Sequence, residues 1–202
     1  MQENTQNKAQ TETQTQSNQA EPTSATVSLK GRTRLLRYSE QAQFRDHLLR
    51  LDRTSRRDRF NGSTSDHFIV TYANRCFSNG AVVIGYVEDG QVLAAAELHE
   101  RAGDIRPTGE IAFSVERHLQ RRGLGRQLFA RLVEGARAFG YERLIVTTHP
   151  CNEAMKRLAR SFNASLSFDH GETVGLIELE TVSRSLTPPG ADMSSMTRAA
   201  AI

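Results

Sequence analysis

Apolar residues early in the chain recur three or four positions apart in two segments. The first segment predicts a helix capped at its start by Ser39, and the second predicts a helix that begins at Ser65 or Asp66. Leu35 and Leu36 predict a short extended segment ahead of both. The apolar positions that define the two helices are Phe44, Leu48 and Leu51 in the first, and Phe68, Ile69, Tyr72, Ala73 and Cys76 in the second.

The pattern then changes to three strands joined in sequence. Residues 81–86 form an apolar run, Glu88 to Gln91 is a hairpin-turn sequence, and residues 92–98 form the partner strand. A loop leads to a third strand at residues 110–115. Consecutive strands of this kind predict an antiparallel meander.

The second half of the chain alternates between helix and strand. We expect a long amphipathic helix, a short apolar strand, another helix and a final hairpin that turns at His170-Gly171. This order predicts an α/β fold with a mixed, mostly antiparallel sheet flanked by helices and one right-handed parallel β-α-β crossover at its centre. The expected ranges are 123–140 (helix), 144–146 (strand), 152–162 (helix), 165–168 (strand) and 173–179 (strand).

Composition places one domain between two polar tails. The chain has 202 residues, which is enough for one domain of ordinary size. Residues 1–31 are rich in Gln, Thr, Asn and Ser, and residues 185–202 are short, small and polar after a Pro-Pro-Gly break. Such segments bury too little apolar surface to offset their ordering entropy. We therefore expect disordered tails at 1–31 and 185–202, and a folded domain at 32–184.

Several classes of protein are disfavoured. The chain has no apolar run of the roughly 18–20 residues that span a bilayer, and no secretory start. Two cysteines are too few for a disulfide framework, and the six histidines have no metal-ligand spacing, so we expect a cytoplasmic protein without a metal. The net charge of +3 is modest. The arginines between 50 and 59 are interpreted as a solvated helix end and loop, and nucleic acid is not expected as a partner.

Candidate chemistry lies between Val115 and Arg126, where a strand ends and a glycine-containing turn leads into the long helix. The first backbone N–H groups of a helix have no partner within the helix. Gly123 and Gly125 allow close approach to the backbone, and the helix dipole and nearby arginines attract negative charge. Such a turn suits a pyrophosphate. It has neither the Walker sequence nor the third glycine of a dinucleotide fingerprint, and a purely structural turn is the alternative.

The run from Gln120 to Gly125 resembles the Gln/Arg-x-x-Gly-x-Gly/Ala signature of the GNAT superfamily of N-acetyltransferases. The resemblance covers nearly all of residues 33–183. Residues 110–115 and 152–159 are most similar to bacterial protein-lysine acetyltransferase domains. The family implies that acetyl-CoA lies in a splay between two parallel strands and donates its acetyl group to an amine, on a small molecule or on a protein lysine.

The resemblance also implies a set of residues that bind acetyl-CoA. The pantetheine would pair with the backbone of the central strand, the pyrophosphate would rest on the N–H groups of the turn, and an asparagine would hold the cofactor arm. The residues so implied are Phe113, Ser114 and Val115 for the pantetheine, Gln120, Arg121, Arg122, Gly123, Leu124, Gly125 and Arg126 for the turn, and Asn152 for the arm.

The attacking amine must be neutral, which for a lysine with a pKa near 10.4 costs roughly 4–5 kcal/mol at pH 7. Glu110 resembles the glutamate that acts as general base in lysine-acetylating members, and Glu97 is the second choice. An ordinary strand-end carboxylate paired with an arginine is the alternative for Glu110. The Val115 N–H would meet the thioester oxyanion, again by resemblance.

The sequence departs from the family pattern where many members have a tyrosine that protonates the leaving thiolate. That position is Ala159, and Ser161 is expected to lie on another face of the helix. A thiol with a pKa near 8.5 hardly requires an acid, so activity is not excluded. Because this tyrosine is absent, the alternative is that the protein is a non-catalytic module that binds acyl-CoA. The sequence indicates no oligomeric state.

Overall fold

The computed structural model describes residues 29–179. The tails predicted at 1–31 and 185–202 lie outside this range, except for residues 29–31. Leu29 packs against the core, and the Gly31 N–H donates a hydrogen bond to Tyr86 Oη at 2.7 Å. Leu29 and Gly31, which precede the first strand, therefore contact the folded domain.

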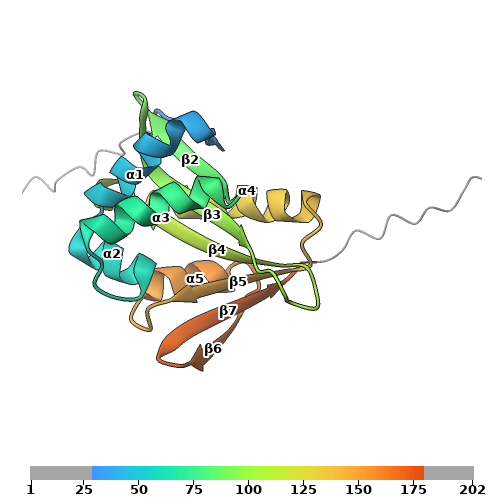
Figure 1. Cartoon of the computed structure of the whole chain (residues 1–202). Coiled ribbons are helices and arrows are strands. Elements are labelled where there is room, and N and C mark those ends of the chain that lie inside the picture. The colour runs from blue at the N-terminus through green and yellow to red at the C-terminus, as the bar shows by residue number, and fades with distance from the viewer. Residues whose placement is uncertain (1–28, 180–202) are drawn as a thin grey trace, which may run out of the picture.

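A seven-stranded sheet forms the middle of the molecule, in the order β1-β2-β3-β4-β5-β7-β6 (Figure 1). Its first four strands form the predicted antiparallel meander extended by β1, and its last three form the β5-β7-β6 side. The strands are β1 (Arg32–Leu35), β2 (Val82–Glu88), β3 (Gln91–Glu100), β4 (Thr108–Val115), β5 (Arg143–Thr148), β6 (Ser165–Asp169) and β7 (Glu172–Glu178).

β4 and β5 are the parallel pair, and they separate before their ends. Their register runs from Thr108 opposite Arg143 to Ile111 opposite Val146. Beyond these residues β4 continues to Val115 and β5 to Thr148 without pairing. The expected parallel crossover and the splay between its strands are therefore confirmed.

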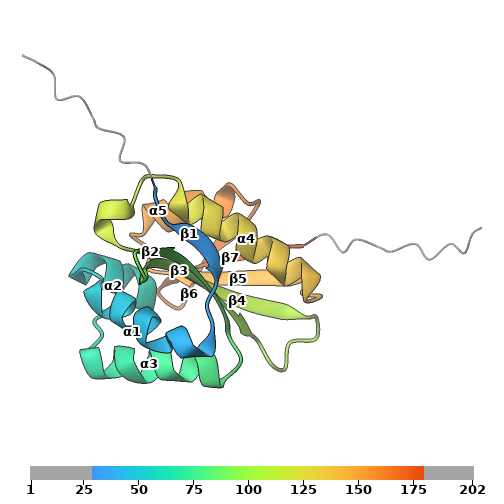
Figure 2. The ribbon, with the colours of Figure 1, turned by 90° about the horizontal axis from the view of Figure 1, so that it is seen from above.

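Helices cover the two faces of the sheet unequally. Figure 2 shows α1, α2 and α3 on one face and α4 and α5 on the other. Each face has its own buried apolar cluster, one built around Phe44 and Ile69 and the other around Leu128 and Phe129. The helices are α1 (Gln41–Arg50), α2 (Arg53–Phe60), α3 (Asp66–Ser78), α4 (Leu124–Ala138) and α5 (Glu153–Arg160). None of the helices within residues 29–179 is long and apolar enough to cross a membrane.

Two local predictions were wrong. Ser39 does not cap α1, because it lies inside a short 3-10 turn (Tyr38–Glu40), where Glu40 accepts the Arg37 N–H and pairs with Arg34. The second difference is α2, which forms where the sequence predicts a helix end and loop. Asp52 begins α2 by accepting the N–H groups of Thr54 and Ser55.

The other capping and turn predictions are confirmed. Ser65 Oγ accepts the Phe68 N–H at the start of α3, and Asn152 Oδ1 accepts the Met155 N–H at the start of α5. The hairpin turns have positive φ at both central residues, Asp89 and Gly90 in one and His170 and Gly171 in the other. This is the geometry that two-residue hairpin turns require.

Candidate active site

The turn between β4 and α4 has the backbone shape that the sequence suggested. After Val115 the chain makes a short 3-10 turn (Arg117–Leu119), and α4 starts at Leu124. Arg121 and Gly123 have φ values of 61° and 78°. At the second of these left-handed positions the chain uses glycine, which adopts it without a steric penalty.

Every backbone N–H from Arg121 to Arg126 is without a hydrogen-bond acceptor among residues 29–179. The Gln120 N–H still donates to Arg117 O, and the Gln127 N–H is the first to be bonded back, to Gly123 O at 3.1 Å. This start of α4 is therefore a concentrated set of free donors at the positive end of a helix, which favours an anion.

The edge of β4 that faces the splay offers a second set of backbone groups. The Glu116 N–H donates to Leu93 O on β3, so by strand alternation Val115 and Phe113 direct their backbone groups away from β3. Gln120 Nε2 already donates to Val115 O at 3.0 Å and also to Ser55 Oγ at 3.1 Å. The Val115 N–H and the backbone of Phe113 are therefore the groups available to an extended ligand.

A cavity of about 330 Å³ joins these two sets of groups. Its walls come from the end of β4, the turn, the start of α5 and, on the opposite side, α2 through Asp52, Ser55, Asp58 and Arg59. The predicted cofactor residues that line it are Phe113, Ser114, Val115, Gln120, Arg121, Gly125 and Asn152.

The other predicted cofactor residues do not line this cavity. Leu124 has its side chain in the apolar core, 1% exposed, and can contribute only its N–H. Arg126 turns toward the end of α5, where Nη1 donates to Ser161 Oγ at 3.3 Å and the guanidinium stacks on Phe162. Arg122 is exposed. Of the three arginines in the turn, only Arg121 lies on the cavity wall.

Asn152 serves the fold as well as the cavity. Its Oδ1 caps α5, and its Nδ2 donates to Thr148 Oγ1 at 2.9 Å. This second bond ties the start of α5 to the end of β5. Asn152 therefore holds α5 against the β5 side of the splay, and it retains one amide hydrogen that the bond to Thr148 does not use.

Glu110 lies in the middle of β4, half-buried, opposite His99 on β3 and Ile145 on β5. It does not line the 330 Å³ cavity. Because side chains alternate along a strand, it shares a face with Ala112 and Ser114. Ala112 lines a small adjoining space of about 20 Å³ at the splay, beside Asp58 and Thr148. Glu110 is thus two residues before the strand residue that lines that space, on the same face of β4.

Glu97, the second choice as base, is fully committed to a buried ion cluster. Its carboxylate pairs with Arg59 Nη2 at 2.7 Å and also accepts from the Tyr72 hydroxyl at 2.5 Å. His99 Nε2 lies 3.1 Å away. Burial alone would raise the pKa of Glu97, but the Arg59 charge and the hydrogen bonds lower it to about 2. A carboxylate held in this way is a poor proton acceptor at neutral pH.

Cys76, Glu97 and His99 offer ligand atoms within 4.8 Å of one another. Burial raises the pKa of the Cys76 thiol, and the nearby Glu97 charge adds to the rise. The Arg59 cation already neutralises Glu97, and a metal would have to compete with it. The expected absence of a metal stays a prediction.

The basic cluster between residues 50 and 59 is largely paired. Arg50 pairs with Glu116, Arg56 with Asp66, Arg57 with Asp58 and Arg59 with Glu97. Most of these guanidinium groups hold α1, α2 and α3 against their neighbours. This pairing reduces the positive potential that the sequence suggested there.

The helix that lacks the family tyrosine supplies no substitute. Ala159 is 1% exposed and lies in the apolar core. Ser161 Oγ donates to Leu158 O at 2.7 Å and accepts from Arg126, so it is turned away as expected. Ser161 is not among the residues that line the cavity.

A buried polar cluster beside the cavity was not predicted from the sequence. Ser114 Oγ lies 2.8 Å from His47 Nε2, and His47 Nδ1 lies 3.2 Å from Glu116 Oε1. His47 comes from α1 and is completely buried. Its place on the same helix face as Phe44 and Leu48 was the one signal in the sequence, because a histidine among core positions requires polar partners.

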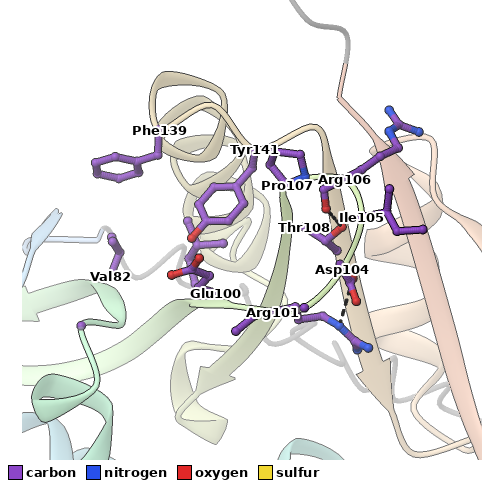
Figure 3. A pocket seen from close by; sticks show the side chains of 14 residues that line it. Val82, Glu100, Arg101, Asp104, Ile105, Arg106, Pro107, Thr108, Phe139 and Tyr141 are labelled. Atoms are coloured by element: carbon purple, nitrogen blue, oxygen red, sulfur yellow. Dashed lines mark hydrogen bonds and ion pairs between the residues drawn. The ribbon is translucent and has the colours of Figure 1, made fainter.

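A larger cavity of about 610 Å³ lies at the other end of β4, around the loop from Arg101 to Pro107 (Figure 3). Tyr141 and Glu100 point toward one another across it, and Arg101 forms an ion pair with Asp104. It is remote from the turn at the start of α4. The smaller cavity, where free backbone donors converge, is the better candidate site.

Comparisons with known proteins identify the family of the chain. The acetyltransferase (GNAT) family profile matches residues 45–163. The chain belongs to this family. A sequence comparison with curated proteins found no match.

Solved structures share the fold at low sequence identity. The GNAT domain of S. lividans PAT is 19% identical, with a TM-score of 0.63, and the match covers 74% of this chain and 90% of that one. A phosphinothricin acetyltransferase from Sinorhizobium meliloti in complex with acetyl-CoA is 16% identical, with a TM-score of 0.54, covering 74% and 88%. The paia N-acetyltransferase from Thermoplasma acidophilum, in complex with coenzyme A, is 13% identical, with a TM-score of 0.56, covering 74% and 99%. The mixed sheet flanked by helices is the GNAT fold.

Proposed function

We propose that this protein transfers the acetyl group of acetyl-CoA to a primary amine, carried by a small molecule or by a protein lysine. The observation that carries the proposal is the convergence, on one cavity, of the free N–H groups at the start of α4 and the unpaired edge of β4. The first set suits the pyrophosphate and the second suits an extended pantetheine.

The proposed donor lies along both sets of backbone groups. With the pyrophosphate at Arg121 to Arg126, an extended arm running between β4 and β5 brings its sulfur end to the splay, near Phe113 and Val115. There the Val115 N–H is the donor for the developing oxyanion. The amine reaches the thioester from the face that carries Glu110 and α2. Glu110 is the proposed base that removes the proton from the ammonium group, directly or through a water.

Acetyl-CoA is expected to bind the folded protein and protect it against unfolding. Calorimetry gives the affinity, and at a hundredfold excess over Kd the free energy of unfolding should rise by about 2.7 kcal/mol. Desulfo-CoA-type analogues that keep the pyrophosphate should protect similarly, whereas pantetheine alone should not. Absence of protection at millimolar acetyl-CoA would contradict the proposed site.

Replacing Glu110 by glutamine is expected to lower turnover at least about tenfold, because general base catalysis typically contributes a hundredfold or more. Release of CoA is measured with acetyl-CoA and a panel of poly-lysine, spermidine and free amino acids. The affinity for acetyl-CoA should be unchanged. Glu134→Gln, on the exposed side of α4, is the matched control. Equal rates in Glu110→Gln and the unmodified protein would remove Glu110 from the mechanism.

A non-catalytic acyl-CoA-binding module is the second candidate, favoured by Ala159 in the place of the family tyrosine. It predicts tight binding of acetyl-CoA without release of CoA to any amine of the panel. The same two measurements therefore separate the candidates.

A further inference from the structure

A buried series of hydrogen bonds starts at the wall of the 330 Å³ cavity and runs to α1. Ser114 lines the cavity, and its Oγ lies 2.8 Å from His47 Nε2. His47 Nδ1 lies 3.2 Å from Glu116 Oε1, and Arg50 Nε donates to the same oxygen at 3.0 Å. A hydroxyl, an imidazole and an orienting carboxylate in this order form an arrangement used for proton transfer.

The hydrogens in this series of hydrogen bonds have one consistent arrangement. Burial alone raises the pKa of Glu116, but hydrogen bonds from His47 and Arg50 lower it overall, so Glu116 is an ionised acceptor. His47 Nδ1 must then carry a hydrogen. Burial also lowers the pKa of His47, which leaves Nε2 with a free lone pair. Ser114 therefore donates its hydroxyl hydrogen to His47, and its own oxygen remains an acceptor for a group in the cavity.

Packing by itself gives little reason for an imidazole at this position. Phe44 and Leu48, on the same face of α1, are completely buried and apolar. An apolar residue at position 47 would anchor α1 equally well, because buried polar networks contribute little net stability compared with apolar packing. The cluster also lies beside a cavity whose α5 wall provides no acid at Ala159.

We infer that Ser114 and His47 form a proton relay for acetyl transfer, which takes a proton from the attacking nitrogen and returns it to the leaving sulfur. The inference rests on the proposed function. In this relay Ser114 is the catalytic residue that touches the amine. His47 is the proton store behind Ser114, and Glu116 and Arg50 are positioning residues.

The proton balance distinguishes this role from that of Glu110. Glu110 removes the first proton from the ammonium group, and the neutral nitrogen then bonds to the thioester carbon. The second proton passes from nitrogen to Ser114 Oγ as the hydroxyl hydrogen moves to His47 Nε2. The C–S bond breaks with its electron pair on sulfur. The imidazolium returns its proton through Ser114, so CoA leaves as a thiol and the relay is reset.

The experiment compares Ser114→Ala, Ser114→Thr and His47→Asn in the full chain, with the amine panel and saturating acetyl-CoA. Asparagine keeps an N–H donor toward Glu116 but offers no lone pair in the place of Nε2. We expect kcat to fall at least about tenfold in Ser114→Ala and His47→Asn, and to stay within about threefold in Ser114→Thr, which keeps the hydroxyl. The affinity for acetyl-CoA and the KM of the amine should change less than kcat.

Leu48→Val is the matched control, because it loosens the buried side of α1 beside His47 without removing a proton-transfer group. It should lower stability and leave kcat unchanged. A kcat for Ser114→Ala equal to that of the unmodified protein would overturn the relay and leave acetyl transfer standing. If Leu48→Val lowered kcat as much as Ser114→Ala and His47→Asn do, the cluster would be assigned to packing and the relay would also be overturned. Acetyl-CoA binding without CoA release by the unmodified protein would overturn the proposed function and the relay with it.

Discussion

Replacing Gly125 by valine is expected to weaken acetyl-CoA binding about a hundredfold, which corresponds to about 2.7 kcal/mol. Gly125 lies in the first turn of α4 and lines the cavity. A Cβ at this position would have Leu158 Cδ2 at 3.4 Å as its near neighbour, which is an ordinary contact. The folded protein can therefore accept the side chain, but the added methyl groups would occupy the space in which the phosphates approach the free N–H groups.

Calorimetry with acetyl-CoA measures the loss, and thermal unfolding without ligand checks the fold. Gly135→Val is the control in the same helix, because a Cβ at Gly135 meets no atom within 4 Å. It should bind acetyl-CoA as the unmodified protein does. An unchanged affinity in Gly125→Val would mean that the pyrophosphate does not rest on the start of α4.

Replacing Arg59 by methionine is expected to lower the free energy of unfolding by about 3–5 kcal/mol, the usual effect of leaving one partner of a buried ion pair alone. The Arg59 and Glu97 side chains are 9% and 0% exposed. Urea unfolding measures the effect. Arg57→Met, two residues away and 44% exposed, should change the stability by less than about 0.5 kcal/mol. The double replacement of Arg59 and Glu97 by methionine should recover much of the loss.

The same pair predicts a pH dependence of stability. Glu97 has a folded pKa of about 2 against an ordinary value of 4.5. The contribution of Glu97 to the free energy of unfolding is therefore fully present above about pH 4.5 and is lost as the pH falls toward 2. In Glu97→Gln this part of the acid dependence should disappear. An unchanged acid unfolding profile in Glu97→Gln would show that the carboxylate is not held in the ionised form.

Much of the fold could be predicted because its signals are local. The long apolar stripe of α4 and the two-residue turns around Gly90 and Gly171 have patterns that single out one local structure. α2 could not be found in this way. Its sequence, RTSRRDRF, has one large apolar residue, and its helical state depends on Asp52 at the start and on the partners of its arginines in other elements.

The parts of the candidate site that are contiguous in the sequence could also be predicted. The turn from Gln120 to Gly125 and the cap at Asn152 are contiguous motifs, and the structure brings both to one cavity. Glu110 was proposed as the base by resemblance; it does not line that cavity, and its role stays a prediction. The contribution of α2 to the cavity wall, and the links from Ser55 to Gln120 and from Asp58 to Thr148, were outside the reach of sequence patterns.

The sequence by itself determined the order of helices and strands and the donor-rich start of α4, because each depends on neighbours a few positions apart along the chain. The parallel crossover joins residues 35 positions apart, such as Thr108 and Arg143, and it was predicted from the order of the elements. Only the tertiary structure decided which charged groups are neutralised and which polar groups meet. His47 and Ser114 are 67 positions apart, and Arg59 and Glu97 are 38 apart. Contacts at such separations depend on how α1 and α2 pack on the sheet, and the periodicity of either segment contains no information about its distant partner.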